Sequence, residues 1–276
     1  MQYNGIKAQY PGEGRRKWCL RVLYESWPTI TSEVQPPDFG TSIVPDDPDP
    51  QDGLLEDEEL GLIIRTDFTN DTAWSNFYNK VLETQKELVS DLKAGASGSA
   101  DDSVDTKADV AMNDVSQTTD DNSKSGSDCE SAPDIVKFLY PQDPETRQQL
   151  TNLSNLKALR LYNDVGIRTA PTRPEGTKPI SPSNPLIDQN GWQEIYSGKN
   201  IWIYDSRSNT DECVRVVAQK SDFYGTATGD SWRARGTYVC ELQFSMAYQG
   251  MNISFNGMDG WDHAERSRNL REALEL

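Results

Sequence analysis

Histidine is nearly absent from this sequence of 276 residues, which contains only His263, in a charged stretch near the end of the chain. Histidine most often moves protons near neutral pH and is the commonest metal ligand. A single histidine in a charged helix is far more often a solvated surface residue than a catalyst. The sequence therefore argues against histidine-based catalytic triads and histidine-rich metal sites, and we expect no metal or other cofactor.

Cysteine is also scarce, and the four cysteines lie far apart at spacings that match no metal site. Cys129 lies in an acidic segment, where we expect a free and exposed thiol. The other three, Cys19, Cys213 and Cys240, stand among apolar residues and are predicted to be buried thiols.

Long apolar runs are missing as well. No run approaches the about 20 residues that a membrane-spanning helix needs, and the first residues lack the apolar core of a secretion signal. We therefore expect no membrane association and a cytoplasmic protein with reduced thiols, with the nucleus as the other compartment that fits.

The charge is strongly one-sided, with a net value of −17, but the excess is confined to two segments. Residues 33–59 contain ten Asp or Glu and no Lys or Arg, and residues 94–132 contain nine Asp or Glu and two Lys. The rest of the chain has 25 acids and 25 bases. This balance argues against nucleic acid as a partner, because phosphate binding needs a net basic face.

The composition of both acidic segments argues against a folded core, because residues 33–59 are rich in proline and acids and residues 94–132 lack aromatic residues. We interpret residues 33–59 as an extended or disordered acidic, proline-rich linker, and residues 94–132 as a disordered acidic insertion. Residues 1–32 are expected to join the core. Within them, the alternation of Trp18, Leu20, Val22 and Tyr24 predicts a strand, although the basic residues 15–17 could instead anchor an acidic partner.

The core unit begins with a short apolar run at residues 60–64, typical of a buried strand. A polar turn follows, in which Thr69 or Asn70 can cap a helix predicted over residues 71–93. Trp74 begins the apolar stripe of that helix, so we expect it to lie in the core.

Order is predicted to return after the insertion, with a strand at residues 134–140 and a helix capped by Asp143 that continues through a leucine stripe to residue 161. Residues 199–205 and 213–218 are typical of a hairpin. Residues 237–247 and 251–255 are further strand candidates, and residues 261–276 are predicted to form a helix with solvated charges.

Three charged residues at the end of the first core strand form the first candidate site: Arg65, Asp67 and Asp71. Sheets of α/β proteins place ligands at the carboxyl ends of their strands. The structural alternative, an internal ion pair and a helix cap, is favoured because no nucleophile or metal partner stands nearby in sequence. Residues 225–231 (GTATGDS) have the glycines of a phosphate loop, but Asp230 occupies the position where such a loop needs lysine, which favours a plain polar loop.

Residues 65–74 (RTDFTNDTAW) resemble the opening motif of a family of small bacterial and fungal domains of unknown function. The family ends in an Asn-rich strand and a Met-Asp pair, and residues 252–259 (NISFNGMD) are similar to that ending. The strands at 200–205 and 213–218 stand where the family has an Asp-ended and an Arg-Val-Val strand. The acidic insertion, the proline-rich loop after residue 168, residues 219–250 and Trp261 depart from the family, so the resemblance covers about half of the chain.

This resemblance adds Asn252, Asn256 and Asp259 to the candidate binding residues. A fungal branch of the family is similar to accessory factors for the biogenesis of translation elongation factor 1-alpha, which implies a protein partner and supplies no catalytic residue.

Together these observations predict one α/β (α+β) domain, formed by residues 60–93 and 133–276, with a mixed sheet flanked by two or three helices. The function that fits is a non-enzymatic interaction protein, chaperone-like, for a basic client such as elongation factor 1-alpha. The alternative is a small-molecule-binding domain or enzyme with a pocket at the end of strand 60–67.

Overall fold

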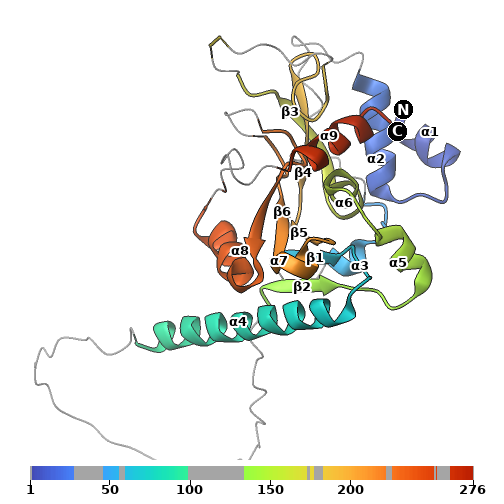
Figure 1. The fold of residues 1–276 in the computed structure, drawn as a ribbon. Helices are drawn as coiled ribbons and strands as arrows, with labels where there is room; N and C mark the ends of the chain where they lie inside the picture. The colour runs from blue at the N-terminus through green and yellow to red at the C-terminus, as the bar shows by residue number, and fades with distance from the viewer. Residues whose placement is uncertain are drawn as a thin grey trace, which may run out of the picture.

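The computed structural model describes residues 2–27, 46–55, 60–98, 134–172, 175–176, 183–221, 226–251, 253 and 262–275. Its centre is a five-stranded sheet with the order β2-β1-β5-β6-β7 and helices on both faces (Figure 1). The predicted fold class, a mixed sheet flanked by helices, is confirmed. The assignment of the core segments to one domain stays a prediction.

β1 (Gly61–Arg65) is the central strand that its apolar run predicts, and all five of its residues are buried. It runs parallel to β2 (Val136–Leu139) on one side and to β5 (Asn200–Tyr204) on the other. β5 then pairs antiparallel with β6 (Cys213–Val217), which confirms the predicted hairpin. β7 (Ser231–Arg235) closes the other edge of the sheet, antiparallel to β6.

Alternating side chains of the central strands enter two separate apolar layers. Ile63, Trp202 and Tyr204 pack with residues of α4 (Asp71–Gly98) and α8 (Val239–Tyr248), and we call this side the α4 face. Leu62 and Ile203 point to the opposite side, where α6 (Asn155–Tyr162) and α9 (His263–Glu272) contribute the apolar contacts, and we call it the α6 face.

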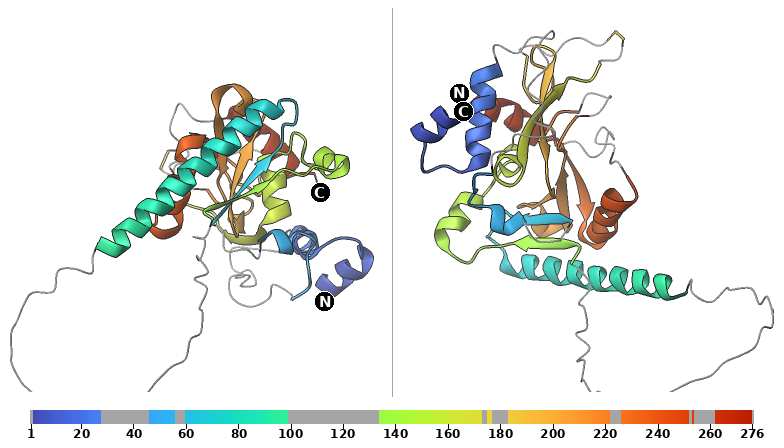
Figure 2. Two further views of the ribbon diagram at one scale, coloured as in Figure 1. Left: turned by 90° about the horizontal axis from the view of Figure 1, so that it is seen from below. Right: turned by 180° about the vertical axis from the view of Figure 1, so that it is seen from behind.

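The long helix α4 follows β1 as predicted and continues five residues past the predicted end at Lys93. The Asn70 side chain accepts a hydrogen bond from the Ala73 N–H at 3.0 Å, so Asn70 is the cap. Figure 2 shows the C-terminal half of α4 extending beyond the sheet. Within the described parts of the chain, no helix is both long and apolar enough to cross a membrane.

Two helices replace the single helix that was predicted after Asp143. Asp143 does cap α5 (Pro144–Leu150), by accepting from the Thr146 N–H at 2.8 Å. The chain then breaks at Asn152, whose φ of 54° lies in the left-handed region, and Ser154 caps α6. The leucine stripe spans both helices, and its members are buried except Leu161, which is partly buried.

The strand predicted around residues 18–24 is wrong, because residues 15–26 form a helix. α1 (Gln2–Gln9) and α2 (Arg15–Ser26) form a helical pair, and α2 buries Leu20 and Leu23. The Tyr24 hydroxyl donates to the buried Glu194 carboxylate at 2.5 Å and accepts from Arg160 at 2.6 Å. The described part of the N-terminal segment, residues 2–27, therefore contacts the core through a helix. α2 packs on the small antiparallel sheet formed by β3 (Asp164–Thr169) and β4 (Trp192–Ser197), which the sequence did not predict.

Part of the acidic linker is also folded, against expectation. Residues 52–55 form the short helix α3 (Asp52–Leu55). Asp49 pairs with Arg16 at 2.8 Å, and Asp52 pairs with both Arg15 and Arg16 at about 3 Å. Asp164 of β3 also pairs with Arg15 at 2.7 Å, so the acidic partners of these basic residues come from the chain itself, in the linker and in the core. Residues 28–45, 56–59 and 99–133, which hold the rest of both acidic segments, lie outside the described residues.

The strand predicted at residues 237–247 is wrong as well, because a short 3-10 helix η2 (Gly236–Tyr238) leads into α8. The strand predicted at 251–255 lies mostly outside the described residues. α9 confirms the predicted C-terminal helix. The turn between β5 and β6 contains the short helix α7 (Ser208–Asp211). Of the cysteines predicted to be buried, Cys240 is buried, whereas Cys19 and Cys213 are half-buried.

Candidate functional site

The structure brings Arg65, Asp67 and Asp71 together at the carboxyl end of β1. Arg65 is 3% exposed, and its guanidinium donates to the Asp67 backbone oxygen at 2.8 Å and to the Asp71 carboxylate at 2.7 Å. It also lies 5.0 Å from the ring centre of Phe68 and 5.2 Å from that of Trp74. These contacts hold the turn between β1 and α4.

The Asp67 carboxylate is bonded within the chain in the same way. It accepts hydrogen bonds from the Thr69 N–H at 3.0 Å, the Thr69 hydroxyl at 2.6 Å and the Asn209 side-chain amide at 2.9 Å. Partial burial disfavours its charge, but these hydrogen bonds outweigh burial and lower the pKa of Asp67. Asp67 therefore connects the end of β1 to α7 through its hydrogen bond with Asn209. A role of Asp67 in ligand binding stays a prediction.

The other three candidates from the sequence, Asn252, Asn256 and Asp259, lie outside the described residues. Their placement beside Arg65 stays a prediction.

His263 is exposed at the start of α9, in agreement with the sequence analysis. Asp230, in the glycine-bearing loop, accepts from the Ala227 N–H at 2.7 Å and pairs with Arg266, which supports a structural loop.

The connections of the neighbouring parallel strands β1 and β5 diverge at the carboxyl ends of these strands. The chain leaves β1 toward β2 through α4, and it leaves β5 in the opposite direction, toward β6. In α/β sheets, ligands bind where the connections of neighbouring parallel strands diverge in this way. The residues at this point are Thr66, which donates its N–H to the Tyr204 carbonyl at 2.8 Å, and Asp205.

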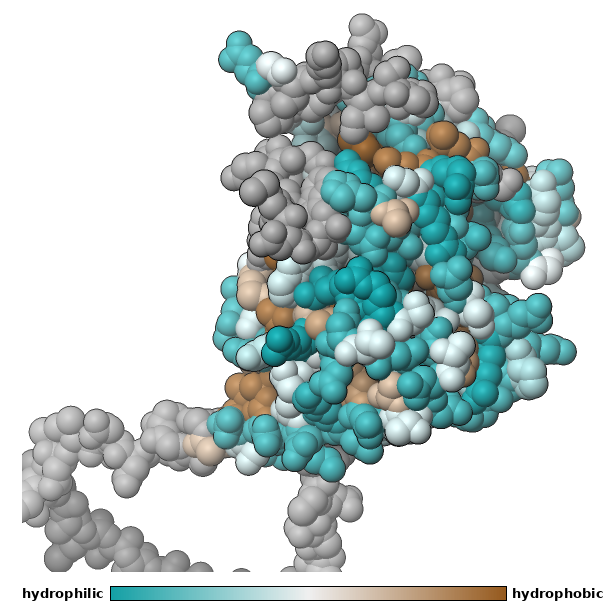
Figure 3. Space-filling model, viewed as in Figure 1, coloured by the Kyte–Doolittle hydropathy of each residue, from teal (hydrophilic) through white to brown (hydrophobic). Residues whose placement is uncertain are grey.

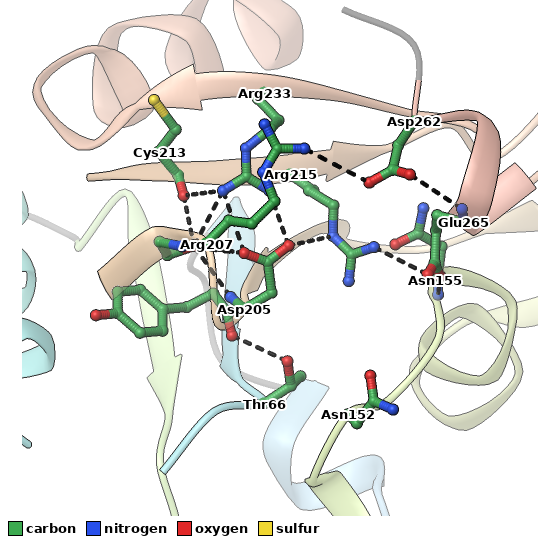
Figure 4. Close-up of polar contacts among 12 residues, drawn as sticks. Thr66, Asn152, Asn155, Asp205, Arg207, Cys213, Arg215, Arg233, Asp262 and Glu265 are labelled. Carbon is green, nitrogen blue, oxygen red and sulfur yellow. Dashed lines mark hydrogen bonds and ion pairs between the residues drawn. The ribbon is translucent and has the colours of Figure 1, made fainter. Parts of the chain in front are cut away.

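A cluster of ion pairs lies at the carboxyl end of β5, on the α6 face of the sheet (Figure 4). Asp205 pairs with Arg215 at 3.1 Å and with Arg233 at 2.8 Å, and Arg233 also pairs with Asp211 at 3.0 Å. Burial raises the pKa of Asp205, but the hydrogen bond from Arg233 and the charges of Arg215 and Arg233 outweigh it, so the pKa lies below its ordinary range.

α9 supplies the other half of the cluster. Glu265 accepts from the Asn155 N–H at 2.7 Å and pairs with Arg215 at 3.1 Å, and it is 7% exposed. Glu272 bonds to the Ser154 hydroxyl and to Arg268. The prediction that these acids are solvated is therefore wrong, because they bind the N-terminal end of α6 instead.

Arg215 is buried and faces two carboxylates in this cluster. Its Nε lies 3.1 Å from Asp205 and its Nη1 lies 3.1 Å from Glu265, and within the described residues the buried Nε makes no hydrogen bond. Figure 4 shows the third guanidinium nitrogen of Arg215 directed away from both carboxylates, on the side where Thr66 and Asn152 lie. A buried guanidinium nitrogen can bind a carboxylate, phosphate or carbonyl oxygen.

Sequence reasoning missed this cluster, although one signal was present. Arg215 interrupts the apolar strand of residues 213–217 (CVRVV) at a position paired with the buried Ile203. A charge at an inward position of a central strand needs a buried partner. Within the described parts of the chain, no group of three or more His, Cys, Asp or Glu residues is arranged to hold a metal ion.

Comparisons with models of protein families, with curated proteins and with solved structures found no match to this chain.

Proposed function

We propose that the protein is a non-enzymatic interaction protein that binds a basic protein partner. One observation carries this proposal: the acidic excess lies in two segments of the sequence, whereas the rest of the chain is electrically balanced. Uncompensated acidic charges accelerate the approach of a basic partner, and this attraction weakens as the salt concentration rises.

Ion pairs within the chain reduce the number of acidic residues in the first segment that are available to a partner. Asp47, Asp49 and Asp52 of the first acidic segment pair with Lys7, Arg16 and Arg15. The second segment, residues 94–132, contains nine acids and only two lysines and is the stronger candidate for the attracting element. Its position in the chain, directly after the projecting end of α4, supports the same assignment.

The sequence resemblance to accessory factors makes elongation factor 1-alpha the candidate client, in the cytoplasm. The test is a pull-down from fungal extract with the full chain at low and high salt. The proposal predicts capture of basic proteins, elongation factor 1-alpha among them, with recovery that falls as salt rises. Equal recovery by a variant in which the nine acids of residues 94–132 are replaced by their amides would refute it.

A second candidate function is the binding of a small molecule at the divergence of β1 and β5. The observation that favours it is the buried Arg215, whose Nε makes no hydrogen bond within the described residues, together with the polar residues Thr66 and Asn152 at the end of β1, where the Thr66 carbonyl accepts from the Asn152 N–H at 2.9 Å. Ligand-observed NMR with small carboxylates and amides tests this candidate. Asn152→Gly keeps the positive φ that Asn152 adopts and removes only the side chain, so it should weaken binding without unfolding the protein.

A further inference from the structure

β2 forms one edge of the five-stranded sheet, next to α4 (Figure 1). Gly61 lies opposite Val136, and its N–H donates to the Ile135 carbonyl at 3.2 Å. In a parallel ladder this register turns the backbone groups of Lys137 toward β1 and those of Val136 and Phe138 outward. The Val136 N–H is bound by the Gln85 side chain at 3.1 Å, but the outward N–H and C=O of Phe138 have no partner within the described residues.

Aromatic rings lie beside this edge, on the α4 face. Tyr78 packs on Phe138 with ring centres 4.5 Å apart, and Tyr140 packs on Tyr78 at 5.5 Å and on Trp74 at 5.7 Å. Tyr140, directly after the strand, is 38% exposed. Exposed faces of such rings attract ammonium and guanidinium groups. Figure 3 shows that the described residues on that side of the molecule are mostly hydrophilic, with smaller apolar patches.

Charge complementarity identifies the occupant. The acidic residues 94–132 come shortly before β2 in the chain, and the exposed Asp134 lies between them and β2. A basic chain attracted by these acids arrives next to an open strand edge. An extended peptide can then add to the sheet, with main-chain hydrogen bonds supplying affinity and alternate side chains supplying specificity.

We propose that an extended, basic segment of a partner protein pairs with β2 as an added strand and places a lysine or arginine against Tyr140. This inference rests on the proposed function, because it assumes that the partner is basic. It adds the surface that holds the partner once the acids have attracted it. β2 is short, which agrees with transient binding rather than with permanent assembly.

Amide hydrogen exchange of the full chain tests the proposal with three short synthetic peptides. The first alternates lysine with valine, the second alternates lysine with proline and carries the same charge, and the third alternates glutamate with valine. Proline cannot donate to a β ladder. The lysine–valine peptide should bind and slow exchange of the Phe138 amide, the lysine–proline peptide should leave that amide unchanged, and the glutamate–valine peptide should not bind.

Two variants distinguish binding at β2 and Tyr140 from general electrostatic attraction. Tyr140→Ala should weaken the lysine–valine peptide about two- to fivefold, the loss expected for an exposed cation–π contact. Tyr238→Ala is the matched control, since Tyr238 is 55% exposed on η2, and it should leave affinity unchanged. If both basic peptides bind equally and the Phe138 amide is never protected, this inference fails while the proposed function stands. If neither basic peptide binds, both fail.

Discussion

Replacing Trp74 by alanine tests how the core is built around β1 and α4. Trp74 is 4% exposed, and its ring centre lies 4.9 Å from Tyr204 and 5.9 Å from Phe77. It also lies under the guanidinium of Arg65. The substitution removes a large buried ring from the apolar layer between α4 and the sheet and leaves a cavity that α4 cannot close without leaving the sheet. We expect a loss of about 3–5 kcal/mol in the free energy of unfolding.

Chemical denaturation with urea measures this loss, and thermal denaturation should show a fall of roughly 10 °C in Tm. The matched control is Tyr248→Ala on α8, an aromatic residue that is 68% exposed and should change stability by less than about 0.5 kcal/mol. A loss of less than about 1 kcal/mol for Trp74→Ala would refute the reasoning, because removal of a buried aromatic ring from a packed core costs several times more.

Three further predictions follow from the same contacts. Asp67→Asn should cost about 1 kcal/mol, because the amide keeps one acceptor for Thr69 and loses the charge, and thermal denaturation checks it. Limited proteolysis should cut first within residues 94–132 and leave two fragments that separate only in denaturant; separation without denaturant would show that the core segments are independent domains. The lowered pKa of Asp205 means that its contribution to stability is present at neutral pH and is lost as pH falls below the ordinary aspartate value of 3.8 and through the folded-state pKa. Tm should therefore fall steeply there, and Asp205→Asn should lower Tm at neutral pH and flatten that dependence.

Local patterns in the sequence were sufficient to predict the centre of the fold. The run from β1 through Asn70 into α4 has a buried strand, a cap and a helical stripe that all favour the same structure, and the structure confirms each of them. The hairpin of β5 and β6 was equally local. Consistent short-range signals of this kind are what make an element predictable.

The helices α2 and α8 were mistaken for strands because their apolar residues alternate. In α8, Leu242, Phe244 and Met246 follow a strand-like period of two. The contacts of Gln243 explain the helix: its side chain accepts from the Trp202 indole at 2.8 Å and donates to the Leu60 carbonyl at 3.0 Å. Tertiary bonds of this kind override a weak local preference.

The ionic cluster at the end of β5 could not be predicted for a different reason. Asp205, Arg215, Arg233 and Glu265 lie on four separate elements, and only the strand order brings them together. The sequence places a charge at each position without indicating its partner. The same holds for Arg16 on α2, whose partners Asp49 and Asp52 come from the acidic linker.

The association of the purified full chain with purified elongation factor 1-alpha tests the central claim most directly. The measurement is the association rate at increasing salt, for the natural sequence and for the variant with amides at the nine acidic positions of residues 94–132. A client attracted by this segment should bind the natural chain fast at low salt, with a rate that falls steeply as salt rises, and the variant should bind slowly with little dependence on salt. Equal rates and equal salt dependence for the two proteins would contradict the account.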